Sequence, residues 1–197
     1  MKAANTKRGW GWVTRAIHWI MAALILYQLG LGIWMTNFVD DLLVRFDLTQ
    51  THKSWGFVIF ALALLRIVWR LANRASPGLP AGTARWQGHA AQVSHAMLYL
   101  LMLVLPLSGW AMSAASPTQD LLGIQNTVFG WFSMPDPWVP GVKSVEEAAQ
   151  TIHFAGGVLL AALLAVHAGA ALKHHFVDRD RVLSGMTFGG SGDARSR

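Results

Sequence analysis

Residues 150–173 read QTIHFAGGVLLAALLAVHAGAALK, the clearest structural signal in the chain. This run is long and apolar enough to cross a bilayer as one helix, for which about 20 residues suffice. Its two histidines, His153 and His167, are fourteen residues apart. At about 1.5 Å per residue and 3.6 residues per turn, they are separated by about 21 Å and return to nearly the same helix face. The run therefore predicts a transmembrane helix with one imidazole near each membrane boundary.

Three other apolar runs have a similar length, so the sequence predicts an all-α transmembrane four-helix bundle. The expected spans are residues 13–36, 52–71, 90–114 and 150–173. The composition agrees, because 53% of the chain is hydrophobic and 13% is charged, against about 25% charged in soluble domains. We expect one membrane domain over residues 1–187 and a disordered, Gly-rich tail at 188–197.

The charges predict the orientation of the bundle. Basic residues gather in both tails and in the connection between the second and third spans. The other two connections carry most of the acids: Asp40, Asp41, Asp47, Asp120, Asp136, Glu146 and Glu147. This asymmetry predicts that both termini are cytoplasmic. The same distribution argues against a nucleic acid partner, because the basic residues are divided among membrane-flanking segments.

Cysteine is absent from the chain. This excludes thiolate-ligated iron–sulfur clusters, covalently attached c-type haem and disulfides. A redox centre in this protein must therefore be held by other side chains, and histidine is the obvious candidate.

Four histidines pair by depth in the predicted bundle. His18 and His167 fall in the cytoplasmic half, whereas His52 and His153 fall in the periplasmic half. Imidazoles are rare in membrane spans and are usually functional there. Two layers of paired imidazoles predict two six-coordinate b-type haems, one near each membrane face. Zinc is the alternative metal, but it favours four ligands at one point. The alternative without a metal is that each histidine near a membrane interface serves as a polar anchor.

Each of these four histidines has a small residue four positions later, on the same helix face. These neighbours are Ala22, Gly56, Gly157 and Ala171. A flat macrocycle needs such an open face. His95 is followed by Tyr99 at this spacing and fails the criterion, so we expect it to form an interhelical hydrogen bond; the alternatives are a quinone pocket or a substitute ligand. His89, His174 and His175 also fail.

Basic side chains lie at the depths where haem propionates would emerge. The candidates are Arg15, Lys53, Arg66 and Arg70. Charge-assisted pairing with a carboxylate is the functional interpretation. For Arg66 and Arg70, anchoring of the span at the cytoplasmic boundary is an equally good one.

The connection at 116–149 is the longest, and it contains Trp131 and Trp138 among several prolines. Tryptophan prefers the membrane interface, so we expect this segment to lie on the periplasmic surface. An unstructured loop is the alternative.

Several motifs, taken in order, resemble the bacterial cytochrome b561 family of di-haem inner-membrane proteins. They are RAIHW at 15–19, HKSWG at 52–56, LLRIVWRL at 64–71, HAMLYLL at 95–101, LPLSG at 105–109, IHF at 152–154 and HAGAALKHH at 167–175. The resemblance covers roughly residues 10–178. It implies a multi-pass protein of the bacterial inner (plasma) membrane with two haem b groups on His18, His52, His153 and His167.

The expected function is transmembrane electron transfer linked to the quinone pool. Some members of the family are similar to superoxide:ubiquinone oxidoreductases, which makes ubiquinone and superoxide candidate substrates. The long Trp-rich connection differs from those members, so the sequence is compatible with both an electron carrier and an enzyme. The alternative is a haem b membrane-anchor subunit of a larger respiratory complex, of the hydrogenase or formate dehydrogenase type, with a redox protein docked on the periplasmic face.

Overall fold

The computed structural model describes residues 2–7, 9–78, 83–136 and 140–187. Four long helices dominate it: α1 (Trp12–Asn37), α2 (Leu42–Ala72), α3 (Arg85–Ala114) and α5 (Lys143–Phe176). Each is long and apolar enough to cross a membrane, which confirms the predicted all-α transmembrane four-helix bundle. The predicted disordered tail at 188–197 lies outside the described residues.

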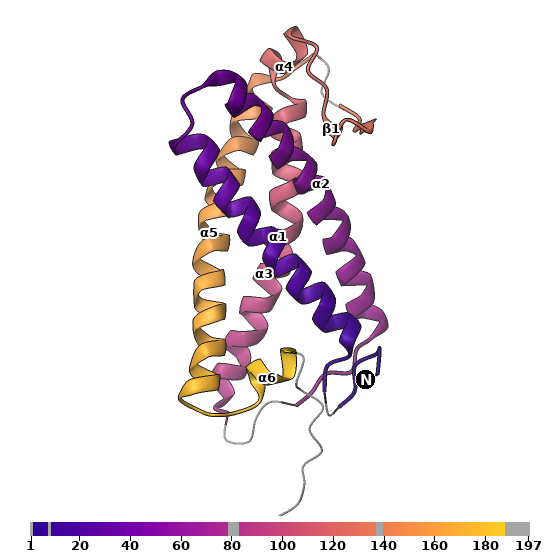
Figure 1. The fold of residues 1–197 in the computed structure, drawn as a ribbon, viewed down its shortest axis with the longest axis vertical. Coiled ribbons are helices and arrows are strands. Elements are labelled where there is room, and N and C mark those ends of the chain that lie inside the picture. The colour runs from indigo at the N-terminus through magenta and orange to yellow at the C-terminus, as the bar shows by residue number, and fades with distance from the viewer. Residues whose placement is uncertain (1, 8, 79–82, 137–139, 188–197) are drawn as a thin grey trace, which may run out of the picture.

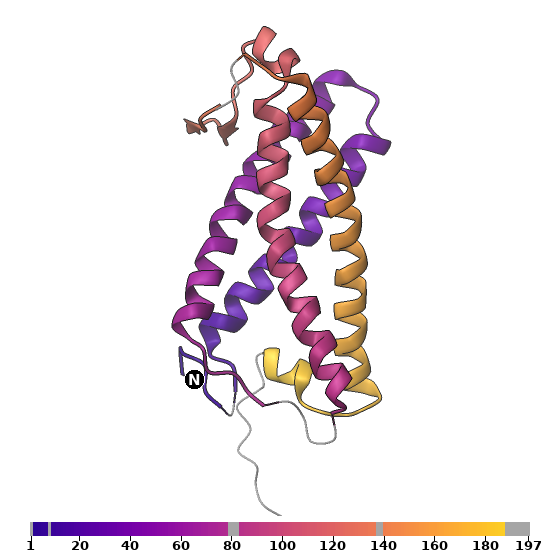
Figure 2. The same cartoon turned by 180° about the vertical axis from the view of Figure 1, so that it is seen from behind.

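The short elements lie at the two ends of the bundle (Figures 1 and 2). One end carries the N-terminal segment, the end of α2, the start of α3 and the short helix α6 (Val182–Met186). The other end carries the α1–α2 connection, the short helix α4 (Pro117–Leu121) and a hairpin of β1 (Thr127–Val128) and β2 (Phe132–Ser133). The first and last described residues therefore share one end, as the even number of spans requires.

Two helices extend well beyond their expected spans at the α4 end. α2 begins ten residues before His52, because the Asp41 side chain accepts hydrogen bonds from the amides of Leu43 and Val44 and caps the helix. α5 begins at Lys143 in a turn that also contains Glu146. These added turns are too polar for the membrane core, so each helix is longer than its apolar span.

The core lies midway along the bundle, between the two histidine levels. It is built from α1 (Met21, Ile25), α2 (Ile59, Ala63), α3 (Leu101, Met102) and α5 (Leu160). Leu160 is two turns from both His153 and His167, so this apolar layer separates the two pairs. Many other large apolar residues of the long helices, such as Leu26 and Trp34, are exposed. Such an outward apolar surface is what a lipid environment requires.

The helices do not pack evenly. α3 makes the close backbone contacts with α5, while α1 packs on α2 and α2 packs on α3. The α1–α2 pair stands further from α5. Side chains, not adjacent backbones, bridge that wider separation.

The segment after α3 is folded onto the bundle. Lys53 Nζ of α2 donates to Ser113 Oγ at 3.2 Å and to Gln119 Oε1 at 3.1 Å. Asn126 is fully buried, bonds to Ser113, and donates to Asp136 Oδ1 at 2.6 Å. The described part of this connection is therefore ordered, in contrast to the alternative of an unstructured loop.

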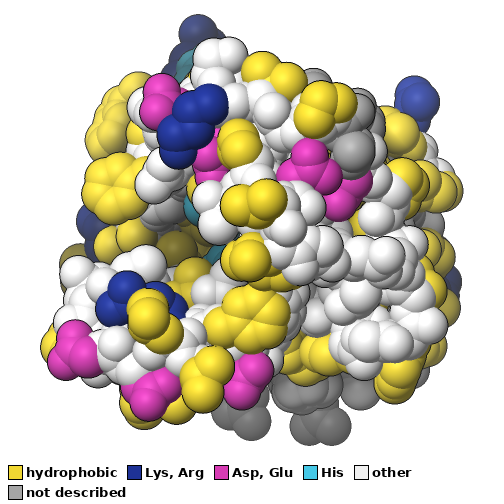
Figure 3. Space-filling model, turned by 90° about the horizontal axis from the view of Figure 1, so that it is seen from above, with side chains coloured by type: hydrophobic (Ala, Val, Ile, Leu, Met, Phe, Trp, Pro, Cys, Tyr) yellow, Lys and Arg dark blue, Asp and Glu magenta, His cyan; other side chains and the backbone are white. Residues whose placement is uncertain are grey.

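The hairpin turn is anchored on α2. Its two central residues, Phe129 and Gly130, have φ of 51° and 72°, as a type I′ turn requires. Phenylalanine is uncommon in this conformation. Here its amide donates to Ser54 Oγ at 3.0 Å, and its ring packs 5.3 Å from that of Trp55. Seen from above, acidic and apolar side chains are interspersed over this end of the molecule (Figure 3).

Candidate functional site

The four histidines expected to act together form two pairs across the bundle. His18 of α1 faces His167 of α5 with ring centroids 6.3 Å apart and an interplanar angle of 63°. His52 of α2 faces His153 of α5 at 6.1 Å and 76°. All four side chains are half-buried. α5 thus contributes one imidazole to each pair, and the partners come from the two helices that stand apart from it.

The ring separations fit one metal ion between each pair. A metal–imidazole bond is about 2 Å long, and the ring centre lies about 1 Å behind the bonding nitrogen, so imidazoles on opposite sides of one ion have centroids about 6 Å apart. Both observed separations match this value. Each pair offers two imidazole nitrogens, a donor set that suits a six-coordinate b-type haem.

His153 is the most firmly oriented of the four. Its Nδ1 lies 3.0 Å from the Leu105 carbonyl oxygen and 3.2 Å from Ser108 Oγ. A carbonyl can only accept, so Nδ1 carries the hydrogen and the free lone pair lies on Nε2, as a metal ligand requires. Gly109 completes the support, because a Cβ at this position would lie 3.0 Å from His153 Cε1.

His18 is held in the opposite way. Arg66 Nη2 lies 3.0 Å from His18 Nδ1, and a guanidinium can only donate, so Nδ1 accepts and Nε2 carries the hydrogen. A metal bond through Nε2 needs the other tautomer. Arg66 must then turn away from His18, and the Tyr99 hydroxyl, 3.3 Å from Arg66 Nε, already holds the opposite side of the guanidinium.

The small residues four positions after each histidine leave open space. Ala22, Gly56, Gly157 and Ala171 are all half-buried. A Cβ added at Gly157 would meet no atom within 4 Å, and one at Gly56 would meet only Gln28 Nε2, at 3.7 Å. At the level of His52 and His153, the two glycines therefore leave space on the helix faces that carry the imidazoles.

Gln28 is a neighbour of the site that sequence reasoning missed. Its Nε2 donates to the His52 carbonyl at 2.8 Å, which ties α1 to α2 at this level. Gln28 Oε1 and His52 Nδ1 are both buried without a hydrogen-bond partner among the described residues. Buried polar atoms normally have a hydrogen-bond partner. These two atoms therefore mark a polar region inside an otherwise apolar bundle. Gln28 lies 24 residues before His52, and no local sequence pattern predicts that the two residues are close in the structure.

The four basic candidates have different surroundings. Arg66 lies against His18, as described, and Arg70 is exposed at the same end of α2. Lys53 is engaged with Ser113 and Gln119. Arg15 is buried, and its Nη1 donates to the Thr187 carbonyl at 2.8 Å, which fastens the α6 segment to α1. Arg66 is therefore in direct contact with a histidine of the two pairs.

His95 also reaches the first pair. Its ring centroid is 5.4 Å from that of His167, closer than His18, but its side chain is exposed whereas His18 is half-buried. The 5.4 Å separation is shorter than the separation of about 6 Å for imidazoles on opposite sides of one ion. His95 therefore packs against the edge of a proposed ligand; the hydrogen bond expected for it is absent from the interactions of the described residues.

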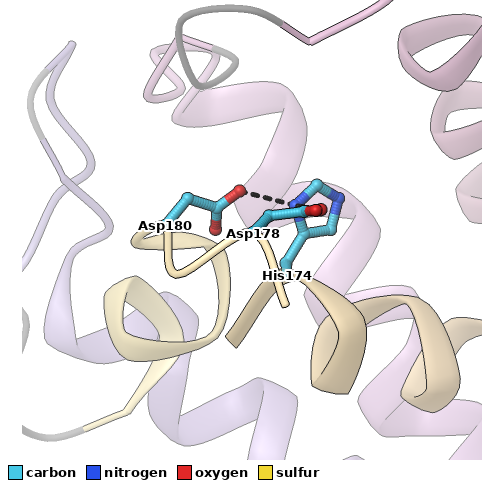
Figure 4. A group of neighbouring side chains, drawn as sticks. All are labelled: His174, Asp178 and Asp180. Carbon is cyan, nitrogen blue, oxygen red and sulfur yellow. Dashed lines mark hydrogen bonds and ion pairs between the residues drawn. The ribbon is translucent and has the colours of Figure 1, made fainter. Parts of the chain in front are cut away.

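A separate polar cluster closes the connection from α5 to α6 (Figure 4). His174 Nδ1 lies 2.5 Å from Asp180 Oδ2 and 3.3 Å from Asp178 Oδ2. The three residues have the ligand types of a metal site. However, Lys173 Nζ lies within 2.8 Å of both Asp178 oxygens, so the cluster is accounted for by ion pairs at a helix C-terminus.

Comparison with known proteins shows which family the sequence resembles. The family model described as prokaryotic cytochrome b561 matches residues 9–189. The chain is 29% identical over 195 residues to cytochrome b561 homolog 2 of Escherichia coli (strain K12), with 98% of each chain covered. It is also 29% identical over 175 residues to cytochrome b561 homolog 1 of the same organism, covering 86% of this chain and 92% of the relative.

Proposed function

Because this chain belongs to the prokaryotic cytochrome b561 family, a family of inner-membrane haem b electron-transfer proteins, we propose that it carries electrons between two haem b groups across the bacterial inner membrane. His18 and His167 ligate one iron, and His52 and His153 ligate the other. The observation that carries this proposal is the repetition of one ring separation, 6.3 Å and 6.1 Å, at two levels of the bundle.

Haem supplies reversible one-electron chemistry at its iron, and the chain supplies position and surroundings. α5 sets the distance between the two levels, since its helical rise between His153 and His167 is about 21 Å. The apolar layer around Leu160 excludes water between them. The Leu105 carbonyl orients His153, and its hydrogen bond increases the basicity of the ligating nitrogen.

The propionates are assigned to the basic residues nearest each pair. Arg66 turns from His18 to a propionate of the first group, which frees the His18 tautomer needed for ligation. Lys53 follows His52 in the sequence and serves the second group by exchanging its bonds to Ser113 and Gln119 for one to a propionate. Arg15 and Arg70 are weaker candidates, since Arg15 is occupied by the α6 segment and Arg70 is exposed.

The quinone pool is one redox partner, reached within the membrane. The other acts on the periplasmic face and is superoxide or a redox protein. The hairpin favours a redox protein as this partner, because it is fixed to α2 yet exposes 83% of Trp131 and 55% of Phe132. A docked redox protein would also support the alternative role of the chain as the haem b anchor of a larger respiratory complex. An ordered apolar surface, at an end of the molecule where acidic side chains are also exposed, suits protein docking better than steering of an anion.

The number of haems tests the proposal directly. Purified protein is expected to contain two low-spin b haems per chain, because two axial imidazole pairs are available. A pyridine haemochrome assay against protein concentration measures the count, and a redox titration of the visible spectrum resolves the two centres. One haem per chain, or a colourless preparation, would contradict the two-level arrangement.

The orientation of the bundle is tested with introduced cysteines, because the native chain has none. Ser133 of the hairpin and Ser76 after α2 are both exposed, at opposite ends. We expect Ser133→Cys to react with a membrane-impermeant thiol reagent in intact spheroplasts, and Ser76→Cys to react only after lysis. The reverse result would place the termini outside and exchange the sides of the two haems.

A further inference from the structure

Two unpaired polar atoms lie at the level of the His52–His153 pair. Gln28 Oε1 of α1 and His52 Nδ1 of α2 are both buried and have no hydrogen-bond partner among the described residues. They belong to residues that already touch, because Gln28 Nε2 donates to the His52 carbonyl at 2.8 Å. A buried donor or acceptor that lacks a partner is destabilising. One interaction that satisfies both atoms would remove this cost.

The chemistry of ligation makes these two atoms complementary. A neutral imidazole has one N–H and one lone pair, so a His52 that binds iron through Nε2 carries its hydrogen on Nδ1 and needs an acceptor for it. The amide of Gln28 is fixed by its first contact, since the His52 carbonyl can only accept and the Nε2 group must face it. The remaining atom of this amide, Oε1, is therefore an acceptor without a donor.

The packing of α1 brings the same edge of the His52 ring toward Gln28. A Cβ at Gly32 would lie 3.5 Å from His52 Cε1, the ring carbon that is bonded to both nitrogens. Gly32 follows Gln28 by four residues and shares its helix face. The nitrogen-bearing edge of the imidazole thus lies against the face of α1 that carries Gln28. One water molecule between the two residues can accept from Nδ1 and donate to Oε1, as buried waters between polar groups commonly do.

We propose that Gln28 is a positioning residue for His52: through one bridging water, Gln28 Oε1 accepts the hydrogen of His52 Nδ1 and fixes the tautomer whose Nε2 binds iron. This inference rests on the proposed function and adds a residue to its second haem site. Gln28 does for His52 what the Leu105 carbonyl does for His153. Such a hydrogen bond increases the basicity of the ligating nitrogen, which stabilises the oxidised iron and lowers the midpoint potential of this haem.

The midpoint potential of the second haem tests this role. The variants are made in His18→Ala protein, which is expected to keep only that haem, so that a single midpoint is measured. Gln28→Met preserves the length of the side chain but replaces the amide with a weakly accepting thioether. We expect its midpoint to rise, with a change in the oxidised-to-reduced ratio at fixed potential of about five- to tenfold, tenfold being about 59 mV for one electron. Gln28→Glu keeps an acceptor oxygen, and its midpoint should be at or below that of the parent protein.

Leu29→Ala is the matched control, because Leu29 is the next residue of α1 and packs against the apolar core. It loosens the same helix without removing a polar atom, so its midpoint should equal that of the parent. Haem content is measured on every sample. If Gln28→Met binds no haem, Gln28→Glu should restore binding, and failure to restore it would overturn the role of Gln28.

Two other results would also overturn it. One is a parental midpoint in Gln28→Met, as expected if His52 bound iron through Nδ1. The other is an equal rise in Gln28→Met and Gln28→Glu, which would trace the effect to the lost donor and not to the acceptor. Both leave the proposed function intact when the native protein holds two haems. Native protein without haem would instead contradict the proposed function.

Discussion

Replacing His52 with alanine is expected to remove one haem and leave the other, reducing the content from two per chain to one. The reason is geometric: His52 is paired with His153, while His18 and His167 are paired on the far side of the apolar layer around Leu160. His18→Ala should remove the other haem. Pyridine haemochrome counts give the number lost, and the redox titration shows that a different centre disappears in each variant.

His95→Ala is the control for these substitutions. His95 lies near His167 but is exposed, and its 5.4 Å ring separation is shorter than the separation of about 6 Å for imidazoles on opposite sides of one ion. We therefore expect the variant to keep both haems. If His95→Ala loses a haem and His18→Ala does not, the partner of His167 has been assigned wrongly and His95 is the ligand.

Hydropathy predicted the number of membrane-crossing helices but not their lengths. The sequence from Leu42 to Thr51 contains Arg45 and Asp47, so the apolar signal begins only at His52, although the helix begins at Leu42. Hydropathy measures which residues tolerate lipid. Helix limits depend on hydrogen bonds, here those of the Asp41 cap, and the two need not coincide.

The expected depth of each histidine in the membrane predicted which histidines meet. Antiparallel spans with short connections place residues at known depths. Depth could not predict the second contacts of those histidines. Arg66 lies 48 residues from His18, and Leu105 lies 48 residues from His153. These contacts depend on the rotation of each helix about its axis and on the uneven packing that keeps α3 close to α5. The hairpin was missed for the same reason, since its anchor on Ser54 is 75 residues away.

The open face beside His153 leads to a more demanding prediction. Gly157→Leu is expected to eliminate the haem of the His52–His153 pair while leaving the fold and the other haem unchanged. A Cβ at this position meets no protein atom within 4 Å, and leucine has a higher helix propensity than glycine. The substituted Cβ therefore meets no protein atom, whereas a macrocycle lying against this face would conflict with the leucine side chain. Haem content and gel-filtration profile measure the two effects separately.

Gly169→Leu provides the matched comparison on the same helix. A Cβ at Gly169 also meets no atom within 4 Å, but this residue is exposed and does not follow a histidine at the four-residue spacing. It should keep both haems, since its side chain points to lipid. Two haems in Gly157→Leu would mean that no macrocycle lies over Gly157, and the small residues after the four histidines would then reflect only the abundance of glycine and alanine in membrane helices. Loss of haem from Gly157→Leu alone would instead place the second group between α2 and α5, against the face that His153 and Gly157 share.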